Sequence, residues 1–146
     1  MTVSRQMLCY VYGLIALVAF IGTWGNILVY LDIGFIGATV LFWKETLVNP
    51  ASRFITVDIV FLGLAVIVWA VLEARRLGIR GIWIYVAGGL FIAISVAIPL
   101  FLIHRERALS SAEPESAAGT LTFSDVIGLI VLSVVLLGYT AVTLMQ

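Results

Sequence analysis

Asp58 is the residue of this sequence with the clearest chemical potential, because it is an ionisable side chain inside an apolar segment. A carboxylate at the middle of a membrane-spanning helix costs about 3 kcal/mol on insertion scales, so such a residue usually has a partner or a function. If the segment began after Asp58, only about 21 Å of helix would remain before its charged end, against a hydrocarbon core of about 30 Å. We therefore expect Asp58 to lie within the membrane or just below its surface.

Four other polar residues are candidate partners of Asp58. Asn49, Ser52 and Arg53 precede it on the same predicted helix, and Asn26 lies near the end of the preceding apolar segment. Asn26 reaches a similar depth if the two helices are antiparallel neighbours. These side chains either hydrogen-bond Asp58 and hold helices together or form with it a polar ligand-binding site within the membrane.

Three aromatic residues, Phe54, Phe61 and Trp69, share a helical face with Asp58. An aromatic wall suits a flat or prenyl-like apolar ligand and can stabilise a carbocation through its π face. Asp58 is therefore the first candidate for a functional residue, and Phe61 and Trp69 are candidate ligand-binding residues. Packing against helices or lipid is the alternative role for these aromatic residues.

The composition excludes several classes of protein. Of the 146 residues, 63% are hydrophobic and 11% are charged, which is incompatible with a soluble globular domain. Eight basic residues balance eight acidic ones, so nothing favours nucleic-acid binding. With one cysteine, Cys9, and one histidine, His104, the chain cannot form an internal disulfide or a paired-histidine metal site. We expect no metal and no cofactor.

Long stretches without charge predict an all-α fold, an integral membrane four-helix bundle. The membrane domain, residues 1–107, contains predicted spans at 7–31, 54–72 and 82–103, and a fourth span occupies 122–146. Residues 35–47 are too short to span and predict an interfacial or re-entrant helix. Residues 108–121 have the small, polar composition of a flexible linker. Asn49 and Pro50 predict the start of the second spanning helix, as its N-cap and first residue.

Four straight spans would place both ends of the chain on one side of the membrane. That side would hold Arg5, Arg75, Arg76 and Arg80, and the opposite side Lys44, Arg53, Arg105 and Arg107. Equal numbers of basic residues on the two sides do not determine the orientation of the protein in the membrane. The short basic loop at 75–80 and the Arg5 leader favour cytoplasmic termini in a plasma (inner) membrane.

Four segments of the sequence together resemble a known family. They are NPASRFITVD (49–58), EARR (73–76), Trp83 and ISVAIPLFLIHR (94–105). Over about residues 10–107 they resemble the small prokaryotic integral membrane proteins grouped as domain-of-unknown-function family twenty-eight thirty-four, whose activity is mostly unassigned. The same signature is similar to that of some larger fungal membrane terpene cyclases. That resemblance implies acid-initiated cyclisation with Asp58 as the acid.

Two classes of function follow. In the first, the protein binds a hydrophobic ligand, a membrane lipid or an isoprenoid, at the cluster of Asp58, Asn26, Asn49 and Ser52, with or without terpene-cyclase-like catalysis. In the second, it is a non-catalytic subunit or self-assembling component of a membrane complex. The small residues Gly88 and Ser95, about two turns apart, would then let a neighbouring helix or a second copy approach closely.

Overall fold

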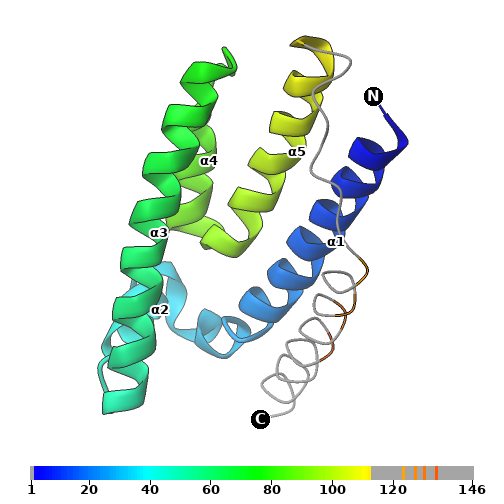
Figure 1. Ribbon diagram of the computed structural model, residues 1–146. Helices are drawn as coiled ribbons and strands as arrows, with labels where there is room; N and C mark the ends of the chain where they lie inside the picture. Colours follow the sequence, from blue (N-terminus) through cyan, green and yellow to red (C-terminus); the bar gives the residue numbers. More distant parts are fainter. Residues whose placement is uncertain (1, 113–122, 124–126, 128–129, 131–133, 135–146) are drawn as a thin grey trace.

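The computed structural model describes residues 2–112, together with residues 123, 127, 130 and 134, and the described part contains helices and no strand. The elements in chain order are α1 (Val3–Gly25), the 3-10 helix η1 (Leu28–Ile33), α2 (Gly34–Glu45), α3 (Pro50–Arg76), α4 (Ile82–Gly88), the π-helical turn η2 (Gly89–Ala93) and α5 (Ile94–Ala112) (Figure 1). Three segments are long and apolar enough to cross a membrane: Val3–Gly25, Pro50–Arg76 and Ile82–Ser111. The predicted fourth span and most of the predicted linker lie outside the described residues.

The first helix is shorter at its C-terminal end than the predicted span at 7–31. α1 ends at Gly25, and the amide of the following Asn26 donates from Nδ2 to the Gly22 carbonyl at 2.6 Å. That bond satisfies a carbonyl left open by the helix end. The chain then continues as η1, which packs against α2. The hydropathy pattern placed the end of the predicted span at residue 31, because residues 27–31 are nearly as apolar as α1 itself.

The start of α3 confirms the predicted helix cap. Asn49 Oδ1 accepts a hydrogen bond from the Ser52 backbone N–H at 2.8 Å, and Pro50 is the first helical residue. At the other end of the helix, Gly78 and Gly81 adopt φ angles of +66° and +81°. Glycine takes these values without a Cβ clash, which allows the short turn between α3 and α4.

The segment predicted as a third straight span, 82–103, folds back on itself. The Tyr85 hydroxyl lies 3.1 Å from His104 Nδ1, although a straight helix would separate these residues by about 28 Å. A Cβ built on Gly88 would meet the Ala97 Cβ at 3.7 Å. The chain therefore reverses through η2, and α4 and α5 form a helical hairpin. Figure 1 shows α4 and α5 side by side, joined at the end away from the α3–α4 turn.

Two adjacent glycines give the physical reason for this reversal. Gly88 and Gly89 carry no side chain to obstruct the approach of Ala97, and a π-helical turn is a common place for a helix to bend sharply. At Gly88, the helix that approaches closely is α5 of the same chain. Ser95 stays exposed.

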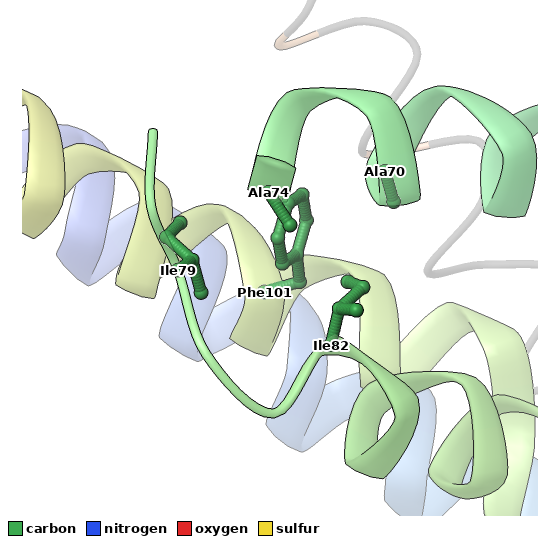
Figure 2. Close-up of a cluster of buried hydrophobic side chains, with 5 residues drawn as sticks. All are labelled: Ala70, Ala74, Ile79, Ile82 and Phe101. Atoms are coloured by element: carbon green, nitrogen blue, oxygen red, sulfur yellow. The ribbon is translucent and has the colours of Figure 1, made fainter. Parts of the chain in front are cut away.

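The hairpin packs against α3 through a small apolar core. Phe101 is fully buried and lies among Ala70, Ala74, Ile79 and Ile82 (Figure 2). Its ring also meets Trp69 and Tyr85 edge-on, at centroid distances of 6.1 Å and 5.7 Å. The alanines of α3 leave room for a ring of this size close to the helix backbone.

The tip of the hairpin lies beside the middle of α3. A Cβ built on Gly63 would come within 2.9 Å of Ile94 Cδ1, so only glycine fits there without a shift. On its other side, α5 packs along α1 (Figure 1). The hairpin therefore occupies the space between α1 and one half of α3, and both of its arms point toward the same end of the molecule.

The helix α5 continues to Ala112, five residues into the predicted linker. Residues 108–112 contain no proline or glycine, and the Ser110 and Ser111 hydroxyls donate to the carbonyls of Glu106 and Arg107, four residues earlier. A small and polar composition alone did not reveal this last turn.

Candidate functional site

Charged side chains from three helices meet at the end of the molecule where α1 begins and α3 and α5 end. Glu73 accepts hydrogen bonds from Arg105 Nε and Arg76 Nε, each at 2.7 Å. Arg105 also donates from Nη1 to Glu106 Oε1 at 2.8 Å, and Arg5 Nη1 lies 3.7 Å from Glu106 Oε2. We call these five residues the charge network. Arg5, Glu73 and Glu106 are buried, so the network joins all three helices and is partly shielded from solvent.

The charge network corrects the predicted distribution of basic residues between the two sides of the membrane. Arg105 bonds Glu73, so it lies at the same end as the α3–α4 turn and not opposite it. The reason is the α4–α5 hairpin, which returns the chain to its starting side. This end holds six of the eight basic residues and the other end holds Lys44 and Arg53; the six are Arg5, Arg75, Arg76, Arg80, Arg105 and Arg107.

A cavity of about 690 Å³ opens beside the hairpin at this same end. Its lining comes from α4 and from one face of α5: Tyr85, Leu100, Ile103, His104, Arg107, Ala108 and Ser111. We call it the hairpin cavity. Along α5 the apolar Leu100 and Ile103 come first and the polar His104, Arg107 and Ser111 follow, nearer the charged end. The lining of the cavity therefore has two parts. The apolar part lies further from the charged end, and the polar part lies nearer to it. We call this polar part, with His104, Arg107 and Ser111, the polar mouth.

Two groups in the polar mouth are fixed by contacts. His104 Nδ1 pairs with the Tyr85 hydroxyl, and the His104 ring packs on the Tyr85 ring at a centroid distance of 6.1 Å. The Ser111 hydroxyl donates to the Arg107 carbonyl. When Tyr85 donates to Nδ1, the neutral imidazole carries its proton on Nε2 and presents a donor there. This arrangement can bind a group that accepts hydrogen bonds and carries an apolar tail.

Asp58 lies on an exposed face of α3. A shallower cavity of about 430 Å³ adjoins it, lined by Pro50, Arg53, Phe54, Val57 and Asp58. We call it the Asp58 cavity. Its lining brings the carboxyl group together with one aromatic ring and one guanidinium. Of the residues predicted near Asp58, Arg53 and Phe54 line this cavity, whereas Asn26, Asn49, Ser52, Phe61 and Trp69 do not.

The remaining predicted site residues have other surroundings. Asn49 and Ser52 are bonded to each other at the start of α3, and Asn26 bonds to its own helix. Phe61 is 67% exposed, while Trp69 packs its edge against Phe101 of the hairpin. The structure thus does not bring the predicted residues together in one place, and their role in binding stays a prediction.

The sequence did not reveal Tyr85, His104 and Arg107 as a group. In the sequence, His104 and Arg107 resemble polar residues that end a membrane-spanning helix at the membrane surface. Tyr85 had the appearance of an interfacial anchor on the opposite side. The only local signal for their proximity was the Gly88–Gly89 pair between them.

No curated protein and no solved structure matches this chain. A family model described as "Protein of unknown function DUF2834" matches residues 11–107. The matched range contains α4, η2 and α5 as far as Arg107, both cavities except Ala108 and Ser111, and every member of the charge network but Arg5. This confirms the resemblance found in the sequence, and because the match covers more than half of the 146 residues, the chain belongs to the DUF2834 family of proteins of unknown function.

Proposed function

We propose that this protein binds an amphiphilic membrane molecule in the hairpin cavity. The observation that supports the proposal is the order of residues on α5, where Leu100 and Ile103 are followed by His104 and Arg107 in one cavity wall. Ligand sites have volumes of about 300 to 1,000 Å³ and are mostly apolar with a few fixed polar groups. The hairpin cavity, at about 690 Å³, falls within this range of volumes, and its lining combines the apolar Leu100 and Ile103 with the polar Tyr85 and His104.

The distribution of basic residues gives the site an orientation. Loops and helix ends that carry an excess of arginine and lysine face the cytoplasm. The end that holds six of the eight basic residues also holds the polar mouth of the cavity. In a plasma membrane the N-terminus of α1 and this mouth would accordingly lie at the cytoplasmic surface, and the ligand would enter from the cytoplasmic leaflet.

A variant that fills the cavity tests the proposal. Leu100→Trp adds an indole to the apolar wall, and we expect it to reduce the lipid that co-purifies in mild detergent by about tenfold, since the ligand's tail loses its space. Leu64→Trp is the matched control, because Leu64 lies on α3 with a similar exposure, 56% against 45% for Leu100. The measurement is mass spectrometry of the retained lipids. Equal retention by the two variants would contradict binding in this cavity.

The Asp58 cavity supports a second candidate function. There a carboxyl group lies beside the Phe54 ring, on the membrane-exposed face of α3. A hydrophobic ligand such as an isoprenoid could contact the ring while its polar group or double bond meets Asp58. Protonation of an alkene by Asp58 is the chemistry that the resemblance to membrane terpene cyclases implies.

Asp58→Asn separates this second function from a structural role. The amide keeps the size and hydrogen-bonding capacity of the carboxyl group but removes its charge and its acidic proton. We expect the variant to melt at the temperature of the parent and to lose any retained isoprenoid or cyclisation product. Asp32→Asn, in the exposed η1 helix, is the control. A variant that keeps every ligand would leave Asp58 without a functional role.

A further inference from the structure

The polar mouth of the hairpin cavity has the chemistry of an anion site. Arg107 is the only charged residue in the lining, and no carboxylate lines the cavity. We propose that this mouth binds the phosphate of an anionic phospholipid, whose acyl chains extend past Leu100 and Ile103. The inference rests on the proposed function and names the class of amphiphile.

Arg107 is the principal donor of the site. None of the ion pairs formed within the described part of the chain involves its guanidinium, and the side chain is exposed. The nearby carboxylates of Glu73 and Glu106 are instead held by Arg5, Arg76 and Arg105. Both carboxylates are therefore already paired with other arginines. The planar donors of Arg107 can bind two phosphate oxygens at once.

When the Tyr85 hydroxyl donates to His104 Nδ1, the neutral His104 ring offers a second donor, its Nε2–H, in a fixed position. Its Nδ1 is engaged by the Tyr85 hydroxyl, so the ring is held and Nε2 remains for a ligand. Arg107 lies three residues further along α5, on the same face of the helix. Two donors from one helix face, both above an apolar wall, fit a headgroup phosphate at the boundary between water and acyl chains.

The apolar wall favours a lipid over a free phosphate ion. Leu100 and Ile103 continue the cavity away from the charged end, where an inorganic ion would gain nothing. The surrounding charge also suits an anionic lipid. Basic pockets between membrane helices on the cytoplasmic side bind anionic headgroups, and this end carries six of the eight basic residues.

The experiment is native mass spectrometry of the full chain in mild detergent, titrated with phosphatidylglycerol or with phosphatidylcholine of the same acyl chains. We expect the parent to prefer phosphatidylglycerol by about tenfold. Arg107→Gln should abolish that preference while phosphatidylcholine still binds. Arg80→Gln removes a charge at the same end but outside the cavity, and it should leave the preference unchanged.

Each other outcome overturns a specific part of the inference. Equal affinity of the parent for the two lipids, or a preference that survives in Arg107→Gln, would overturn the anion site. Displacement of phosphatidylglycerol by millimolar inorganic phosphate would identify a free phosphate as the ligand. Leu100→Trp distinguishes these failures from failure of the proposed function, because it should remove both lipids. If it removes neither, the hairpin cavity is not the binding site.

Discussion

Replacing Glu106 with glutamine is expected to lower the free energy of unfolding by about 3 to 5 kcal/mol, the range for removing one partner of a buried ion pair. The side chains of Glu106 and Arg5 are only 5% and 4% exposed. Without the carboxylate, the Arg5 guanidinium would remain buried with its charge less well compensated. The variant keeps nearly the same volume, so the loss reports on charge and not on packing. Thermal and denaturant unfolding in detergent micelles would measure it.

Arg76→Gln is the matched control for this prediction. Arg76 belongs to the same charge network, but its side chain is 61% exposed, and exposed ion pairs contribute about 0 to 1 kcal/mol. The double variant Arg5→Met with Glu106→Leu should recover most of the lost stability, because replacing both members of a buried pair by apolar residues is often neutral. An equal loss in Glu106→Gln and Arg76→Gln would show that burial of the network does not determine its contribution.

Cysteine labelling should place residues 80 and 111 on the same side of the membrane. The two positions flank the α4–α5 hairpin, and the contact between Tyr85 and His104 brings its arms to one end. In a Cys9→Ser background, Arg80→Cys and Ser111→Cys should both react with an impermeant maleimide from the cytoplasmic side. Val48→Cys, between α2 and α3, should react from the opposite side only. The expected result is that Val48→Cys reacts only from the side of the membrane from which Arg80→Cys and Ser111→Cys do not react.

A straight third span gives the opposite result. It would place Ser111→Cys on the side of Val48→Cys, and labelling of that kind would contradict the hairpin in the membrane. The hairpin also changes the expectation for the end of the chain. If residues 122–146 cross the membrane once, as their sequence predicts, a C-terminal reporter should lie opposite the N-terminus. Four straight spans would place both on one side.

The sequence by itself determined the features that depend on local composition and local hydrogen bonding. Apolar runs with at most one charge identified the segments that are long and apolar enough to cross a membrane, because hydropathy follows directly from residue type. The start of α3 was predictable because Asn49 bonds a backbone N–H only three residues away. The family was recognisable because its motifs are short stretches of sequence, and the family model covers the same region.

Only the tertiary structure decided which distant residues meet. Residues 82–103 have the same hydropathy whether the helix is straight or folded, so the sequence predicted a span where the chain forms a hairpin. Tyr85 and His104 are 19 residues apart, and Glu73 and Arg105 are 32 apart. Their contacts depend on the reversal at Gly88 and on the packing of Phe101 against α3. Because the hairpin cavity and the charge network arise from these contacts, the hydropathy of the sequence led to Asp58 and not to His104 and Arg107.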